Sequence, residues 1–327
     1  MRTSRPEGGT NRRAVRAEGR RWGVMRQVCG FCAAASVARL VGFGVFAFTV
    51  MSMTGCLFTT RKLPVPKAPA VTQTATAEEL IKRLNDRWDA LNSLYAKVDV
   101  KFITTKADLE KTYTSFPAIV MMRKPEMLRI YGQVPVIGSP MFSMASDGKT
   151  FTLFENAKNI AYTGPYIVTH KSANTIENIR PGFFLDALIV RGIAPDQEYM
   201  NMADTDTVED AKRKHLLLSP EYILSVMQQK SGSQERKLIR VIHFHRDDLL
   251  PYEQELYDEQ GDLETEVLYG SYQDFNGSKY PKTVTIKRPL DGFQIVLTVN
   301  SVKENVELKD SQFHIQIPPE VKIQTLQ

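Results

Sequence analysis

Cysteine is scarce in this chain. The three cysteines are Cys29, Cys32 and Cys56, and none follows residue 56. The long remainder must therefore fold on its hydrophobic core, without a disulfide framework. Cys29 and Cys32 have the spacing of a redox or zinc motif. No second pair and no βαβ pattern accompanies them, so we assign them no chemistry.

Catalytic and nucleotide-binding signatures are also missing. The sequence contains no GxSxG, P-loop, GxGxxG or HExxH motif, so nothing points to a hydrolase, a nucleotide site or a zinc protease. His243 and His245 would share one strand face, but no third ligand has suitable spacing. Ser146 and Lys149 have SxxK spacing, which an Asp-Gly turn explains. We expect no enzyme, no metal and no cofactor.

The net charge of +5 belongs to the start of the chain. Nine of the 42 basic residues but only two of the 37 acidic residues lie in residues 1–55, which leaves the remainder at −2. A targeting segment explains the basic sequence pI, and we expect no nucleic-acid partner.

That targeting segment ends in a recognisable cleavage box. Arginines up to Arg26 and an apolar run precede Met53, Thr54, Gly55 and Cys56, as in the signal peptide of a bacterial lipoprotein. A small residue before the cysteine admits signal peptidase II, and the Cys56 thiol takes the diacylglyceryl group. We expect cleavage after residue 55 and a membrane anchor on Cys56.

Two alternatives remain open for this segment. It could stay uncleaved as an anchor helix, although the apolar run 40–53 is shorter than the roughly 20 residues that a spanning helix needs. The unusually long basic region also suggests Met25, rather than Met1, as the start of translation.

The segment 56–77 reads as a tether. Its Pro, Thr, Ala and Lys residues cannot bury enough apolar area to fold, and its prolines favour extended conformations. Leu57 follows the lipidated cysteine, where an aspartate would signal inner-membrane retention in enteric bacteria. We therefore expect an outer-membrane anchor and a domain facing the periplasm.

The remaining residues, 78–327, predict a single mainly β domain. An amphipathic helix over 78–92 comes first, and short helical turns are expected within 172–191, where Asn174 would cap one of them. The polar segment 195–215 is expected to be a mobile insertion. Alternation of apolar and polar residues predicts strands at 94–103, 113–122, 127–133, 140–146, 150–154, 159–163, 221–229, 236–246, 251–258, 263–274, 279–288 and 292–304.

A flat sheet of about eleven strands would leave exposed edges and an uncovered face. We therefore predict a curved, unclosed antiparallel β-barrel, with short helices covering an apolar cavity.

Three segments resemble the LolA/LolB-like family of bacterial lipoprotein carriers and receptors. They are the helix-to-strand entry ending in 92–98, the basic-Pro-x-x-Leu-Arg element at 123–130, and a closing strand at 313–318. The long segment 195–215 and the extended C-terminal meander depart from the family pattern.

This resemblance implies an apolar cavity that holds acyl chains. Candidate lining residues are the inward-facing Val98, Val100, Phe102, Val120, Met122, Ile295 and Leu297. The receptor branch also has an apolar loop that touches the membrane, and Val134, Pro135, Val136 and Ile137 occupy the matching place. The alternative, that this loop folds back and packs, stays open.

Two functions follow as hypotheses. The first is an anchored monomer that binds or transfers lipid or the acyl chains of other lipoproteins. The second is a non-catalytic structural or assembly lipoprotein of the outer membrane that acts through protein–protein contacts. A connected apolar void would favour the first, and a filled core the second.

Overall fold

The structure is a computed structural model that describes residues 72–326, except 107–108, 167–177, 211–214 and 230–231. The predicted signal peptide, the cleavage box with Cys56, and Asn174 lie outside the described residues.

Two α-helices occur in the described part of the chain, α2 (Ala77–Ala90) and α3 (Pro181–Leu188). The strands are β1 (Ser93–Lys106), β2 (Leu109–Thr112), β3 (Phe116–Arg123), β4 (Met127–Gln133), β5 (Pro140–Ser146), β6 (Thr150–Glu155), β7 (Ile160–Pro165), β8 (Glu198–Asp210), β9 (His215–Gln229), β10 (Arg236–His245), β11 (Pro251–Tyr257), β12 (Leu263–Tyr269), β13 (Tyr272–Phe275), β14 (Ser278–Pro281), β15 (Thr283–Arg288), β16 (Phe293–Glu304) and β17 (Lys322–Thr325). Short 3₁₀ turns are η1 (Asn156–Lys158), η3 (Pro289–Asp291) and η4 (Asp310–Phe313).

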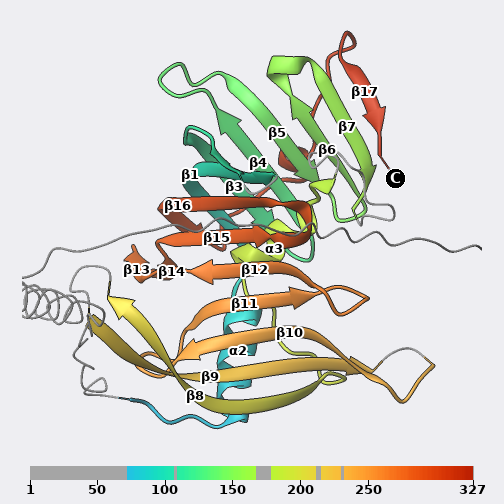
Figure 1. Cartoon of the computed structure of the whole chain (residues 1–327). Coiled ribbons are helices and arrows are strands. Elements are labelled where there is room, and N and C mark those ends of the chain that lie inside the picture. The colour runs from blue at the N-terminus through green and yellow to red at the C-terminus, as the bar shows by residue number, and fades with distance from the viewer. Residues whose placement is uncertain (1–71, 107–108, 167–177, 211–214, 230–231, 327) are drawn as a thin grey trace, which may run out of the picture. The chain divides into compact units, whose positions relative to one another are not determined.

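Fifteen strands form one unclosed sheet (Figure 1). Its order is β17-β7-β6-β5-β4-β3-β1-β16-β15-β12-β11-β10-β9-β8, with β2 paired to β1, and β13 and β14 form a separate hairpin. The expected open antiparallel sheet is thus confirmed in outline, but the predicted strand number was too low. One pair is parallel, β17 with β7.

The first and last strands of the sequence pattern meet in the middle of the sheet. β1 pairs with β16 through Val98↔Val299 and Phe102↔Ile295, with a bulge between Lys97 and Val98. Apolar residues alternate along both strands, and their buried face joins the main core. This pairing unites the N-terminal half of the sheet with the C-terminal meander.

The helix α2 begins where the sequence predicts. Thr76 caps it, accepting a hydrogen bond from the Glu79 backbone N–H, while the Glu79 carboxylate accepts one from the Thr76 N–H. Leu80 and Leu84 bury its apolar face. The chain already contacts the domain before the predicted boundary, because Ala75 is buried and its N–H donates to the Tyr222 hydroxyl.

The expectation of a mobile insertion at 195–215 was wrong. Glu198–Asp210 forms the edge strand β8, which pairs with β9 from Glu198↔Met227 to Asp210↔His215. Main-chain hydrogen bonds stabilise a strand whatever its side chains, and an edge strand tolerates acidic, solvated ones. The polar composition therefore misled the prediction.

The predicted closing strand at 313–318 was also wrong. Phe313 ends the turn η4, and its buried ring packs under the Arg123 guanidinium, 5.2 Å from the ring centroid. The edge strand follows later, as β17. A buried aromatic residue in an alternating segment satisfied the strand pattern without forming a strand.

Candidate functional site

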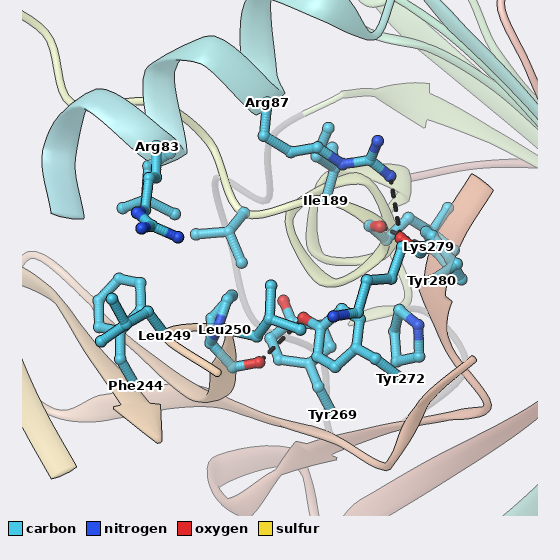
Figure 2. A pocket seen from close by; sticks show the side chains of 15 residues that line it. Arg83, Arg87, Ile189, Phe244, Leu249, Leu250, Tyr269, Tyr272, Lys279 and Tyr280 are labelled. Carbon is cyan, nitrogen blue, oxygen red and sulfur yellow. Dashed lines mark hydrogen bonds between the residues drawn. The ribbon is translucent and has the colours of Figure 1, made fainter. Parts of the chain in front are cut away.

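A cavity of about 220 Å³ lies between α2, the end of α3 and the C-terminal strands (Figure 2). The helix α2 supplies Arg83, Leu84 and Arg87 to its lining. The other lining residues are Leu188, Ile189, Val190, Phe244, Leu249, Leu250, Pro251, Tyr269, Tyr272, Lys279, Tyr280 and Pro281. Most of these are apolar or aromatic, so the cavity suits hydrocarbon.

The tyrosine hydroxyl groups in the lining already have partners. Tyr280 donates to the Leu188 carbonyl (2.5 Å), Tyr272 donates to the Pro251 carbonyl (2.9 Å), and Tyr269 accepts from the Gln254 amide (3.3 Å). Burial raises the pKa of all three hydroxyls well above the ordinary range. They stay neutral at physiological pH and offer the cavity mainly their rings.

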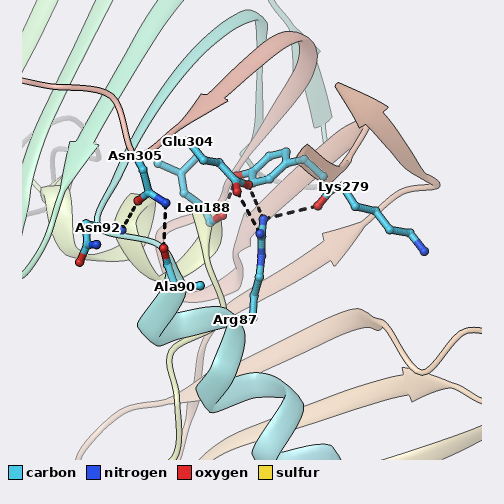
Figure 3. Close-up of polar contacts among 8 residues, drawn as sticks. Arg87, Ala90, Asn92, Leu188, Lys279, Glu304 and Asn305 are labelled. Carbon is cyan, nitrogen blue, oxygen red and sulfur yellow. Dashed lines mark hydrogen bonds and ion pairs between the residues drawn. The ribbon is translucent and has the colours of Figure 1, made fainter. Parts of the chain in front are cut away.

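Polar contacts at the C-terminal end of α2 hold the helix over the cavity (Figure 3). Arg87 binds the Glu304 carboxylate through both terminal nitrogens, at 2.5 and 3.1 Å, and also donates to the Lys279 carbonyl at 3.4 Å. The Asn305 amide donates to the Ala90 carbonyl at 2.8 Å. A bidentate charge-assisted contact restricts the side-chain geometry, so the helical wall is fixed to β14 and β16.

Leu249, in the turn between β10 and β11, has a strained backbone. Its φ of 55° lies in the left-handed region, which costs a non-glycine residue roughly 1–2 kcal/mol. The side chain is nevertheless buried, lines the cavity and packs in the main core. Such strain often accompanies binding sites.

The seven predicted lining residues lie elsewhere, on the central strands β1, β3 and β16. All belong to or pack against the main core, with Phe102 half-buried and the others buried. None of them contributes to the cavity lining described above. In this part of the core the side chains pack against one another.

The loop between β4 and β5 carries its apolar side chains on the surface. Val136 is 107% exposed and Ile137 is 77% exposed, Pro135 is exposed, and Val134 is half-buried. Val136 also has a φ of 70°, which is strained for a β-branched residue. The alternative in which the whole loop folds back therefore does not describe Val136 and Ile137.

The two strand histidines take part in a hydrogen-bonded cluster. His243 Nδ1 lies 2.9 Å from the buried Glu221 carboxylate, which also accepts from the Tyr252 hydroxyl. The His245 ring stacks on Tyr252 at 4.0 Å. Within the described residues, no three His, Cys, Asp or Glu side chains gather as a metal site.

Ser146 and Lys149 belong to a tight turn. The Ser146 hydroxyl donates to the Thr150 carbonyl at 2.8 Å and accepts from the Gly148 N–H at 3.1 Å. Its hydrogen bonds therefore stabilise the turn.

Of the helices in the described ranges, none is long and apolar enough to cross a membrane.

The lining of the cavity was not found from the sequence. In the amphipathic helix that the sequence predicts over 78–92, Leu84 falls on the apolar face and Arg83 and Arg87 fall on the polar face, to which no binding role was assigned. The nearby tyrosines come from β12, β13 and β14, and no local motif links them. The available signals were three tyrosines within 269–280 and, far away in the sequence, two arginines one turn apart on the predicted helix.

No family model and no curated protein matches this chain. Solved structures do resemble it. A LolA superfamily protein, NE2245 from Nitrosomonas europaea, has 14% identity and a TM-score of 0.46, over 74% of this chain and 99% of that one. A DUF1329 family protein from Desulfovibrio piger has 16% identity and a TM-score of 0.46, over 72% and 94%.

A third similar structure is a putative outer membrane lipoprotein-sorting protein domain from Vibrio parahaemolyticus. It has 11% identity and a TM-score of 0.41, and the match covers 71% of this chain and 92% of that one. One of these similar structures is thus a protein of the LolA superfamily, which the sequence pattern resembles. At TM-scores below 0.5 these likenesses assign no function to this chain.

Proposed function

We propose that this chain is a membrane-anchored envelope lipoprotein whose cavity binds an acyl chain, either to hold or to transfer lipid or another lipoprotein. The observation that carries the proposal is the apolar cavity beneath α2. It exceeds the roughly 150 Å³ apolar cavity that holds a benzene-sized guest. It is also smaller than the roughly 300–1,000 Å³ of drug-sized sites, so it would take one segment of a chain.

Hydrocarbon burial would supply the affinity. Each methylene transferred from water to an apolar site contributes about 0.8 kcal/mol. Rings such as Tyr269 and aliphatic side chains such as Ile189 and Leu249 offer that environment. With the tyrosine hydroxyls already hydrogen-bonded, a hydrocarbon guest would leave none of them unpaired.

The anchor completes the proposal. Met53, Thr54 and Gly55 would be the cleavage box, and Cys56 would carry the acyl groups that hold the domain on the periplasmic face of the outer membrane. A second contact would come from Val136 and Ile137, because exposed apolar side chains insert readily at a lipid interface. Incorporation of labelled palmitate, absent in Cys56→Ser, tests the anchor.

Photolabelling tests the cavity in the full chain within its own membrane. An alkyl probe with a chain-borne diazirine, added to membranes and activated by light, should label peptides containing Ile189 or Leu249. The half-buried Leu250 lines the cavity, so Leu250→Trp should fill it and abolish that labelling.

The matched control is Leu290→Trp, at an exposed residue of η3 outside the cavity lining. It should label as the unsubstituted chain does. Labelling confined to other surfaces, or unchanged by Leu250→Trp in a normally folded chain, would refute acyl binding at this cavity.

The packed central core and an exposed sheet edge favour the second candidate, an assembly protein. Tyr199, Met200 and Met202 on the edge strand β8 are exposed, and unpaired strand edges are templates for added strands. Lysine substitutions at Met200 and Met202 would weaken such an association. Under the acyl-binding proposal they leave cavity labelling unchanged.

A further inference from the structure

We propose that the acyl chain taken by this cavity ends in an anionic group such as a carboxylate, which Arg83 and Lys279 bind. This inference rests on the proposed function, because it specifies the head of a ligand whose hydrocarbon part the cavity would hold.

The polarity of the lining is divided between interior and rim. Leu84, Phe244 and Tyr280 are buried, whereas Arg83 and Lys279 are exposed. The charged side chains therefore lie where the cavity opens to solvent. A guest that fits this division has a hydrocarbon body and a charged end.

The charge at the rim has one sign. The charged lining residues are Arg83, Arg87 and Lys279, and none of the lining side chains is an Asp or a Glu. They come from two different elements, since two lie one turn apart on α2 and the third lies on β14. Figure 2 shows all three around the same group of apolar side chains. Clustered positive charge attracts anions.

Among the described residues, two of the three cations have no acidic partner. Arg87 is neutralised by Glu304 at 2.5 Å. In the part of the chain that the structure describes, neither Arg83 nor the Lys279 ammonium group makes an ion pair. Arg83 and Lys279 are thus the groups left to bind an anionic end.

Exposure limits how much these two charges contribute. Ion pairs at exposed positions are weak, so both residues together should favour an anionic over a neutral head by about three- to ten-fold. The hydrocarbon would provide most of the affinity, and the cations would provide selectivity among acyl compounds.

The test compares two photoreactive probes with the same diazirine-bearing chain, dodecanoate and dodecanol. Each is added to membranes holding the full chain, at a pH well above the ordinary carboxyl pKa. The measurement is the labelling of cavity peptides. In the wild-type chain, dodecanoate should label the cavity peptides about three- to ten-fold more than dodecanol does. The double variant Arg83→Gln/Lys279→Gln should lose this preference while its dodecanol labelling stays constant.

Lys82→Gln is the matched control, because Lys82 lies beside Arg83 on α2, does not line the cavity and pairs with Asp86 at 2.6 Å. It should keep the preference. Equal labelling by both probes in wild type, or a preference that survives the double variant, would overturn the anionic head and leave acyl binding standing. Absence of cavity labelling by either probe would overturn acyl binding itself.

Discussion

Tyr269, Tyr272 and Tyr280 bring hydroxyl groups into an apolar region, and each hydroxyl is hydrogen-bonded inside the protein. An unpaired hydroxyl buried there would cost about 1–3 kcal/mol. The partners, a glutamine amide and two backbone carbonyls, avoid that cost without adding charge. The interior of the cavity is apolar because its tyrosine hydroxyl groups are hydrogen-bonded elsewhere in the protein.

These three tyrosines, together with Tyr257, should make the stability of the fold decrease at alkaline pH. Burial raises their pKa values, and burial together with the Glu255 carboxylate raises the pKa of Tyr257 to about 12 from 10.0. The unfolded chain therefore releases these protons first as pH rises. The contribution of these protonated tyrosines to the free energy of unfolding is complete below pH 10. For Tyr257 it should decline between pH 10 and about 12, and for the three cavity tyrosines the decline should continue to higher pH.

Urea unfolding at increasing pH, followed by tyrosinate absorbance, checks this. The urea midpoint should fall above about pH 10, and Tyr257→Phe should reduce the slope over its own interval. Full ionisation of all tyrosines near pH 10 in a chain that is still folded would contradict the raised tyrosine pKa values.

The contact of Arg87 with Glu304 should stabilise the fold measurably. The pair is partly buried and bidentate, so Arg87→Met should lower the free energy of unfolding by about 1 kcal/mol. A double-mutant cycle with Glu304→Gln should give a coupling energy of similar size. The exposed pair Lys82–Asp86 is the control and should couple by only about 0.3–0.5 kcal/mol. Equal coupling in the two pairs would contradict the assigned role.

Among the elements, α2 forms a wall of the cavity, whereas the β4–β5 loop presents apolar side chains to solvent. The helix closes the cavity and is fixed by side-chain contacts at its C-terminal end. In the loop, by contrast, the side chains of Val136 and Ile137 are exposed and do not pack against the core. Its apolar surface therefore serves stability little and is free for an interface.

Vesicle partitioning tests the loop. In a Cys56→Ala chain, which lacks the covalent anchor, Ile137→Ser should weaken vesicle binding about ten-fold or more, because an inserted isoleucine contributes about 1.5–3 kcal/mol. The urea midpoint should not change. Leu290→Ser, at another exposed apolar residue, should bind vesicles like the parent. Equal partitioning of the two variants would remove the loop as a membrane contact.

For the whole molecule, the sequence predicted much of the sheet and little of the cavity. The predicted bounds of β4 and β5 match the observed ones. In β4 one face is buried and the other half-buried, whereas in β5 both faces are buried toward Ser146. Alternation missed β8, since an edge strand needs no apolar face. The cavity joins α2 to the end of α3, a turn and five strands far along the chain, β10 to β14, and no local sequence pattern predicts this proximity.

The most direct test of acyl binding is native mass spectrometry of the full Cys56→Ala chain, purified without detergent from a bacterial host. The cavity account predicts a co-purified acyl compound, or uptake of added dodecanoate, that Leu250→Trp removes and Leu290→Trp retains. A clean unliganded mass in the parent chain, with no uptake of added dodecanoate, would contradict it.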